Sequence, residues 1–240
     1  MVSLRPRGEH AGVHVAARRV GAGVVELSPW AVEPRLDPDT AWDVAAALAC
    51  PRIIATSPPA VRAAAALQTL PAGRTWIAIG GGTAQQLRMA GIPDAIVPTR
   101  MDSEGVLALP ALAQAGPGGA IGVLTAPGGR DVIAPLLAAR GWTVRRADVY
   151  ERVPIDLDPA ALGQLSTLAA PFTTLASSSG ALDRVVDGVD AALAQRLRAA
   201  PLVVASERMA VHARQRGFAR VQVAKGPRPA MLVARAAQGR

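Results

Sequence analysis

Short apolar runs alternate along the chain with longer segments that place apolar residues at helical spacing. Residues 53–55, 121–124 and 202–204 are runs of this kind, and they are bounded by Gly, Pro or Ser, which is typical of buried strands. Residues 132–140 place their apolar side chains on one helical face, and Gly141 follows where a helix-ending glycine is expected. Alternating strands and helices predict an α/β protein with parallel sheets.

The same patterns recur in two halves of the chain. One pattern is a strand, a Pro/Gly turn, a helix and a second strand that ends in an aromatic residue. It covers residues 2–30, ending at Trp30, and residues 121–150, ending at Tyr150. This recurrence predicts two structurally equivalent pieces.

A second pattern joins an apolar strand, a serine turn and a helix to another strand, a small-residue turn and a helix. It covers residues 53–97 and again residues 173–223. Each copy is expected to close with a strand, over residues 94–97 in the first and 220–223 in the second.

The order of the patterns permits two domain arrangements. The chain divides at its middle, or the two middle patterns form a domain inserted between the outer two. Residues 27–34 and 148–154 are extended and punctuated by proline, which is typical of connectors, and this favours the insertion. The expected parts are one domain from residues 1–30 and 155–240, an inserted domain from 36–148, and side-by-side connectors at 31–35 and 149–154.

Composition predicts a folded, soluble protein. Hydrophobic residues make up 50% of the 240 residues, and Arg, Gly, Pro or Asp interrupts every apolar run before it could span a membrane. Arg5, Arg7 and Glu9 fall where a secretory signal needs an apolar core. A lone Cys50 makes no intrachain disulfide or thiolate cage. We therefore expect a cytoplasmic protein with no membrane partner.

The formal net charge of +8 comes almost entirely from arginine, because Lys225 is the only lysine. A GC-rich genome produces such a surface, and so does selection for a polyanionic partner. Aromatic residues are only 3% of the chain and no basic run exceeds two residues, so we expect no nucleic-acid partner. A small polyanion remains open.

Ligands of open parallel sheets bind at the carboxyl ends of strands, where turns and helix N-termini present N–H groups. Serines are also ordinary helix caps and glycines ordinary turn residues, so only their recurrence at equivalent turns brings the functional interpretation level with the structural one. The residues at these turns are Arg5, Ser57, Gly80 to Thr83, Gly128 to Arg130, Ser178 to Gly180, and Ser206 to Arg208.

Several familiar sites are excluded. The Gly80 to Gly82 run lacks the spacing and acidic residue of a dinucleotide fingerprint, and no phosphate-binding Gly-Lys-Ser/Thr occurs. His10 and His14 have a helical metal spacing but no nearby Asp or Cys, so we interpret them as surface histidines on a solvated first helix. His212 is solitary. We expect no metal and no cofactor.

Tyr150 is the only tyrosine. Its phenol could donate a hydrogen bond or a proton at an interdomain cleft. The alternative is a ring that covers a strand end, as Trp30 would at the equivalent point, and the residues alone do not separate the two.

Taken together and in order, these motifs resemble the uroporphyrinogen-III synthase family over nearly the whole chain. Each motif is weak alone, and their order and spacing carry the resemblance. They are Leu4-Arg5-Pro6, Thr56-Ser57-Pro58-Pro59-Ala60-Val61, Ile79-Gly80-Gly81-Gly82-Thr83-Ala84, Ser103-Glu104-Gly105-Val106-Leu107, Gly128-Gly129-Arg130, Asp148-Val149-Tyr150-Glu151-Arg152-Val153-Pro154, Ser206-Glu207-Arg208-Met209-Ala210 and Gly217-Phe218.

The resemblance implies two small flavodoxin-like α/β domains, with parallel sheets flanked by helices, joined by a two-stranded β-ladder. It implies no cofactor or metal. It implies hydroxymethylbilane, a linear tetrapyrrole rich in carboxylates, as the substrate. The terminal hydroxyl leaves as water, a spirocyclic intermediate forms, and the macrocycle closes with the last ring inverted.

The resemblance also implies residue roles. Tyr150 matches the tyrosine thought to assist departure of the hydroxyl. Leu4 and Met209 depart from the family pattern, since Thr is usual at both places, and Thr125-Ala126-Pro127 replaces a usual Arg-Gly. The substrate-binding residues are expected to be Arg5, Ser57, Pro58, Gly80, Thr83, Ser103, Arg130, Ser178, Ser179, Ser206 and Arg208.

We expect a monomer, with a transient contact to the preceding enzyme of the pathway left open. Two other classes compete with the cyclase. One is a two-domain protein that closes on a small anion without catalysis, which the missing signal peptide disfavours. The other is a nucleotide-dependent α/β enzyme, which the absent phosphate and ribose motifs disfavour.

Overall fold

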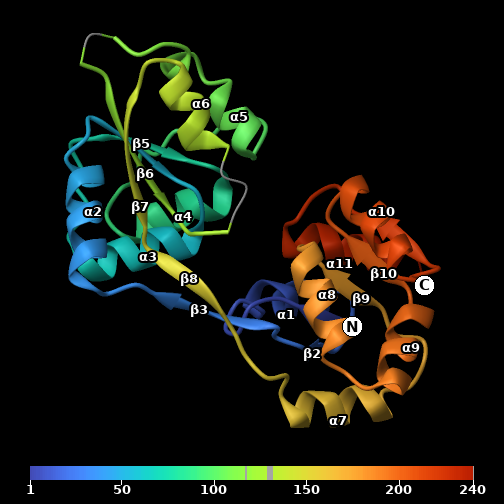
Figure 1. The fold of residues 1–240 in the computed structure, drawn as a ribbon. Coiled ribbons are helices and arrows are strands. Elements are labelled where there is room, and N and C mark those ends of the chain that lie inside the picture. The colour runs from blue at the N-terminus through green and yellow to red at the C-terminus, as the bar shows by residue number, and fades with distance from the viewer. Residues whose placement is uncertain (117, 129–131, 240) are drawn as a thin grey trace. The chain divides into compact units, whose positions relative to one another are not determined.

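A computed structural model describes residues 1–116, 118–128 and 132–239, and the chain forms two compact units (Figure 1). Unit 1 consists of Met1–Ala31 and Arg152–Arg240, and unit 2 is Val32–Glu151. Each unit contains its own parallel sheet between helices. None of the described helices is long and apolar enough to cross a membrane.

Unit 1 contains a five-stranded parallel sheet in the order β11-β10-β9-β1-β2. Its register pairs Val2 with both Val25 and Thr174. The elements of this unit are β1 (Val2–Leu4), α1 (Ala11–Arg18), β2 (Val25–Glu26), α7 (Pro159–Thr167), β9 (Thr174–Ala176), α8 (Ser179–Asp187), α9 (Ala191–Ala199), β10 (Leu202–Val204), α10 (Glu207–Gln215), β11 (Val221–Val223) and α11 (Pro229–Gln238).

Unit 2 contains a four-stranded parallel sheet in the order β5-β4-β6-β7. A short 3-10 turn at Pro110–Leu112 follows α5. The elements of this unit are α2 (Pro38–Leu48), β4 (Arg52–Ala55), α3 (Pro58–Leu67), β5 (Thr75–Ala78), α4 (Gly81–Met89), α5 (Ser103–Leu107), β6 (Ala120–Thr125), α6 (Ile133–Ala139) and β7 (Thr143–Asp148).

The two sheets share one strand order. Numbered within unit 1, the order is 2-1-3-4-5, which is flavodoxin-like. In unit 2 the same five positions of the sheet are occupied by β7, β6, β4, β5 and the bridge at Ile96. Because β4, the first strand of this sheet along the chain, takes the place of β9, the topology of unit 2 is a circular permutation of that of unit 1. The predicted α/β fold class, with its two parallel sheets, is confirmed.

One expected strand is shorter than predicted. The sequence predicts a strand over residues 94–97, but only Ile96 pairs, through an isolated bridge to Ile77. Pro93 and Pro98 bracket the segment, and proline has no N–H to donate to a strand ladder. The equivalent strand in unit 1, β11, pairs over its full length with β10.

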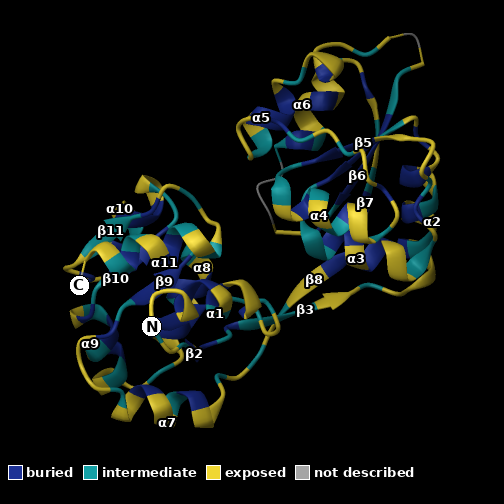
Figure 2. Ribbon diagram, turned by 180° about the vertical axis from the view of Figure 1, so that it is seen from behind, coloured by how far each residue is buried: buried dark blue, intermediate teal, exposed yellow. Residues whose placement is uncertain are grey.

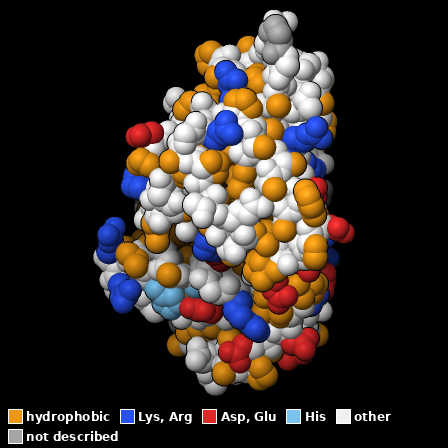
Figure 3. Space-filling model, turned by 90° about the vertical axis from the view of Figure 1, so that its left-hand side faces the viewer, with side chains coloured by type: hydrophobic (Ala, Val, Ile, Leu, Met, Phe, Trp, Pro, Cys, Tyr) orange, Lys and Arg blue, Asp and Glu red, His pale blue; other side chains and the backbone are white. Residues whose placement is uncertain are grey.

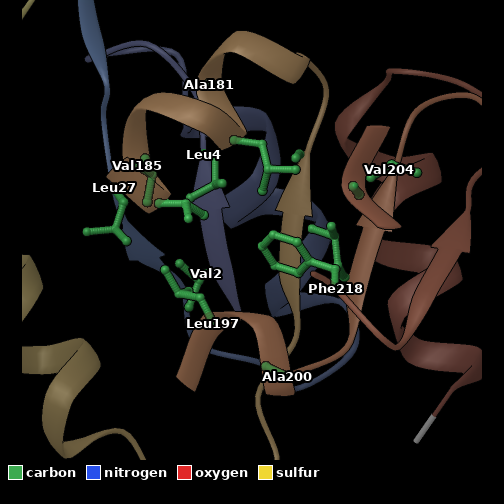
Figure 4. Close-up of a cluster of buried hydrophobic side chains, with 14 of the residues drawn as sticks. Val2, Leu4, Leu27, Ala181, Val185, Leu197, Ala200, Val204 and Phe218 are labelled. Carbon is green, nitrogen blue, oxygen red and sulfur yellow. The ribbon is translucent and has the colours of Figure 1, made fainter. Parts of the chain in front are cut away.

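Successive residues of the buried strands pack alternately into two separate hydrophobic cores. In unit 1, Ala176 packs beneath α8 and α10, whereas its neighbour Leu175 packs with α1 and α11. In unit 2, Ile53 packs with α2 and α3, whereas Ile54 packs with α5 and α6. Figure 2 shows the central strands of the sheets buried and the helices buried on one side only, and Figure 4 shows the cluster around Leu4 and Phe218. Burial on both faces explains why the strands read as continuous apolar runs.

The two segments that join the units pair with each other. β3 (Trp30–Pro34) and β8 (Tyr150–Pro154) form a two-stranded sheet of their own, as expected for a ladder linker (Figure 1). Trp30 and Tyr150 are the first residues of these strands. The aromatic residues that end the repeated pattern therefore stand at equivalent places in the two units.

The histidine interpretation is wrong for His10. The imidazole is 1% exposed, and its Nδ1 and Nε2 lie 3.0 Å from Ser3 Oγ and 2.9 Å from Ser28 Oγ. His14 pairs with Glu26 instead, at 2.5 Å. His10 occupies the N-cap position of α1, so it links this helix to the sheet rather than facing solvent. Its partners lie 7 and 18 residues away in the chain, and helical spacing carries no signal for them.

Gly122 allows α2 to approach the sheet closely. A Cβ built on Gly122 would lie 2.2 Å from the Ala47 carbonyl oxygen, which is backbone and cannot rotate away. Gly73 is an exposed counterpart in unit 2, with no atom within 4 Å of its Cβ position. The absence of a side chain at position 122 is therefore a packing requirement of unit 2.

We expect Gly122→Ala to lower the free energy of unfolding by about 1–3 kcal/mol, because overpacking forces α2 away from β6. Gly73→Ala should stay within about 0.5 kcal/mol of the parent protein. Urea unfolding followed by circular dichroism measures both. Equal stability of the two variants would contradict the close approach.

The buried imidazole predicts a pH dependence of stability. Burial lowers the pKa of His10 below its ordinary 6.5, and the carboxylate of Glu26 opposes this, while Arg5 and His14 add to the lowering. The unfolded chain therefore takes up a proton at a pH where folded His10 is still neutral. Stability is complete above about pH 6.5 and is lost as the pH falls from there toward the folded pKa.

We expect the free energy of unfolding to fall between about pH 7 and about pH 5 by more in the parent protein than in His10→Gln, which has no such proton to bind. Urea titrations at several pH values give the comparison. His14→Gln, which changes a half-exposed histidine, serves as the control. Identical pH profiles for parent and His10→Gln would contradict the assignment.

Candidate functional site

Each sheet has one switch point, where the chain connections that follow two neighbouring strands run in opposite directions across the sheet. It lies between β1 and β9 in unit 1 and between β4 and β6 in unit 2. Ligands of open α/β sheets bind at such points, beyond the carboxyl ends of the strands. The predicted turns therefore form two sets, one in each unit.

In unit 2 the switch point holds a serine and the single tyrosine. Ser57 follows β4 and caps α3, its Oγ accepting a hydrogen bond from the Ala60 N–H at 3.2 Å. The same hydroxyl donates to the phenol oxygen of Tyr150, also at 3.2 Å. Because Ser57 supplies its proton to this bond, the phenol proton of Tyr150 stays available for another acceptor.

Two threonines complete this switch point, and sequence reasoning did not select them. Thr56 Oγ1 lies 3.1 Å from Thr125 Oγ1 and donates to the Leu124 carbonyl at 3.1 Å. The pair bridges the ends of β4 and β6, whose residues are nearly 70 apart in sequence. Thr56 and Thr125 both end apolar runs, and that position was the signal available in the sequence.

The glycine turn of unit 2 lies beside the serine turn. Gly82 is close to α3, since a Cβ on it would be 3.7 Å from the Pro58 ring. Gly80 caps α4 without a side chain, and Thr83 in the first turn is buried. Backbone N–H groups of this first turn are thus not used by a side-chain cap, which suits an anion.

Ser103 stands at the start of α5, near this turn. Asp102, not Ser103, is the cap, because its carboxylate accepts from the Gly105 N–H at 2.8 Å. Met101 lies against Gly80, its Cβ 3.2 Å from the position a Cβ would take there. The segment that carries Ser103 therefore borders the glycine turn through Met101.

In unit 1 the switch point holds a half-buried arginine. Arg5 follows β1, and its Nε donates to the Glu9 carbonyl at 3.0 Å while Nη1 reaches Ser177 Oγ at 3.5 Å. Burial lowers the pKa of the Arg5 guanidinium, and the nearby Glu9 carboxylate partly offsets this. The guanidinium is thus fixed at the end of β1 with its charge next to the start of α8.

Serines cap both helices that follow β9 and β10. Ser178 accepts from the Ala181 N–H and Ser206 from the Met209 N–H, each at 3.4 Å. Ser179 is the first residue of α8 and is half-buried. Arg208 lies in the first turn of α10 and is exposed. These two serines therefore cap helices, and a capping serine can still contact a ligand.

Trp30 takes in unit 1 the place that Tyr150 takes in unit 2. A Cβ on Gly180, the second residue of α8, would lie 3.6 Å from the Trp30 ring. The second residue of α3, Pro59, lines with Tyr150 a cavity of about 150 Å³ that Arg62 also borders. Each unit thus sets an aromatic ring against the first turn of its switch-point helix.

On the face in Figure 3, Lys and Arg side chains are spread out among hydrophobic and uncharged ones, and acidic side chains lie near several of them. The expectation of a solitary His212 is wrong, because its Nε2 lies 2.8 Å from Asp183 Oδ1 across α8 and α10. Among the described residues, no three His, Cys, Asp or Glu side chains gather to hold a metal ion.

The predicted residues fall into two groups. The unit 2 group is Ser57, Pro58, Gly80, Thr83 and Tyr150, with Ser103 at its border, and the unit 1 group is Arg5, Ser178, Ser179, Ser206 and Arg208, all at the carboxyl edge of their sheet. Arg130 lies outside the described residues.

Comparison with solved structures supports the fold. Uroporphyrinogen-III synthetase from Helicobacter pylori matches with a TM-score of 0.64 and 15% identity, over 100% of this chain and 98% of that one. A mutant uroporphyrinogen III synthase from the extremely thermophilic bacterium Thermus thermophilus matches with a TM-score of 0.60 and 19% identity, over 100% and 99%. At these identities the likeness establishes the two-unit fold alone.

Comparison of sequences settles the family. No curated protein matches the chain. The family model described as uroporphyrinogen-III synthase HemD matches residues 13–234, which is nearly the whole chain. With this match and the fold just described, the chain belongs to the uroporphyrinogen-III synthase HemD family.

Proposed function

We propose that this protein cyclises hydroxymethylbilane to uroporphyrinogen III, with loss of water and inversion of the last pyrrole ring. The observation that carries the proposal is the Ser57–Tyr150 hydrogen bond at the unit 2 switch point. It orients the phenol of the only tyrosine and leaves its proton to give. Membership of the family supplies the substrate class.

Tyr150 acts as the general acid. Its phenol proton passes to the terminal hydroxyl of the bilane, the carbon–oxygen bond breaks, and water leaves. The hydrogen bond from Ser57 then stabilises the phenolate, and Ser57 is itself polarised by the Ala60 N–H in the first turn of α3. A proton released when the ring closes restores the phenol.

The carboxylates of the substrate are held by groups that need no change of charge. Arg5 offers a fixed guanidinium beside the start of α8. The first turn of α4 offers N–H groups that no side chain caps. The proposed contacts are Arg5, Ser57, Pro58, Gly80, Thr83, Ser103, Arg130, Ser178, Ser179, Ser206 and Arg208, to which the geometry adds the hydroxyls of Thr56 and Thr125.

Positioning is the main task of this enzyme. Without it, the bilane loses its hydroxyl readily and closes to the isomer whose last ring is not inverted. Holding the substrate so that attack occurs at the substituted carbon gives the spirocyclic intermediate and then the inverted ring. The energetic contribution of Tyr150 is therefore added to a larger one from the carboxylate contacts.

We expect the purified protein to convert freshly generated hydroxymethylbilane to the type III isomer faster than the bilane closes unaided. Separation of the isomers by chromatography after oxidation measures the ratio of type III to type I. Formation of type I alone, at the rate of the enzyme-free control, would exclude the cyclase. If the bilane nevertheless bound in that case, a binding protein without catalysis would be the better description.

We expect Tyr150→Phe to lower kcat by about 10²-fold, because a positioned general acid contributes at least that much. KM should change little, since the carboxylate contacts remain. The free energy of unfolding should fall by only about 1 kcal/mol for the lost hydrogen bond. Unchanged kcat would leave Tyr150 a structural role alone.

The Ser57→Ala variant distinguishes the hydrogen bond that Ser57 donates to Tyr150 from the role of Ser57 as the cap of α3. Loss of the cap costs about 1 kcal/mol of stability in any background. Loss of the proposed substrate contact of Ser57 should appear in KM, whereas the effect of the substitution on kcat should pass through Tyr150, so Ser57→Ala should lower kcat in the parent protein and leave it unchanged in the Tyr150→Phe variant. Equal effects in both backgrounds would show that Ser57 acts on the substrate without the phenol.

A further inference from the structure

A groove lies at the free edge of the unit 1 sheet, between β11 and α11. Its volume is about 510 Å³, within the range of small-molecule sites. β11 is the last strand of the sheet, three strand spacings from β1, so the groove is about 14 Å from the strand that carries Arg5. It is therefore separate from the switch point of unit 1.

One face of α11 forms the wall of the groove. Ala230, Ala234 and Gln238 recur every four residues along this helix, and Met231 stands beside them. The opposite face, with Leu232 among its residues, is buried in the core. The residues of α11 that line the groove, from Ala230 to Gln238, span about 12 Å of helix, given a rise of 1.5 Å per residue.

The floor of the groove is apolar. Val223 lines the groove from β11, although its side chain packs with the core of α8 and α10, and the thioether of Met231 lies against the loop after β11, its sulfur 3.2 Å from the place of a Gly226 Cβ. The alanine and methionine side chains of the groove offer no strong hydrogen bond to a polar ligand. The body of a ligand that fills this groove must therefore be apolar.

The charged groups of the groove are both cations. Lys225, the only lysine of the chain, lines the groove from the loop between β11 and α11, and Arg235 lines it from α11 itself. Within the described residues neither side chain has an ion-pair or hydrogen-bond partner. No acidic residue is among the described residues that line the groove. Two cations without carboxylate partners beside an apolar floor are complementary to an anion with an apolar tail.

We propose that the groove between β11 and α11 binds an amphiphilic carboxylate, with a slim apolar body of about 12 Å along α11 and its anionic group at Lys225 and Arg235. The site is distinct from the proposed cyclase chemistry and does not depend on it. Decanoate has a suitable length and charge and is the probe.

Methionine methyl groups report on the groove directly. The chain has five methionines, of which only Met231 lines the groove. With ¹³C-methyl methionine, we expect decanoate to shift the Met231 resonance saturably, while buried Met209 of the same unit and exposed Met89 of unit 2 stay in place. Met231→Leu assigns the resonance. Equal shifts at Met89 would show non-specific apolar binding and overturn the proposal.

Charge variants test the head-group contact. Lys225→Gln and Arg235→Gln should each weaken decanoate binding about two- to fivefold, the range of a solvent-exposed ion pair. Lys225→Arg should bind as the parent does. Arg214→Gln removes an exposed charge elsewhere in unit 1 and should have no effect.

Two outcomes contradict the site itself. Decanol should bind more weakly than decanoate, and equal affinity would remove the role of the cations. Ala234→Trp fills the groove on an exposed face of α11, so it should abolish the Met231 shift with little loss of stability. Unaltered decanoate binding by this variant would place the ligand elsewhere.

Discussion

Parallel pairing of short strands is the constraint on which the rest of this structure depends. A parallel pair needs a crossover helix, so every strand of a unit ends at the same edge, and each strand except β2 and β7, which lead into the linker strands β3 and β8, is followed by a helix. In unit 2 this brings the turns after β4, β5 and β6 together although they are far apart in sequence. The sheet topology therefore determines where the site lies, whichever side chains occupy the turns.

Helix capping gives the same side chains two uses. Ser57 satisfies an N–H at the start of α3 and, through its own proton, orients the phenol of Tyr150. The equivalent serine in unit 1, Ser178, caps α8 in the same way, and there the ring set against the first turn is Trp30. The internal repeat therefore gives both units a capping serine and an aromatic ring at the first turn of the equivalent helix. The ring of unit 2, Tyr150, carries a hydroxyl that can release a proton, and the ring of unit 1, Trp30, does not.

Most strands and helices, and the serine caps, could be predicted from the sequence because their signals are local. Continuous apolar runs mark strands buried on both faces, and serines mark helix starts. The buried state of His10 could not be predicted, because it depends on Ser3 and Ser28. The Thr56–Thr125 pair depends likewise on which strands are neighbours. Residues whose role comes from strand order become visible only when that order is known.

The groups of the unit 2 cluster that touch one another, Thr56 with Thr125 and Ser57 with Tyr150, are hydroxyls, and the charged Arg62 borders the cavity beside Tyr150. For a substrate with carboxylates on every ring, an acid that became a carboxylate on giving up its proton would repel the substrate, and a cation at the reacting carbon would draw a carboxylate to that carbon. Hydroxyl groups, as at Thr56, Ser57 and Tyr150, donate without either cost. In the proposed cyclase, the phenol that Ser57 orients would therefore supply the proton for departure of the hydroxyl, while helix N-termini and Arg5 would hold the carboxylates.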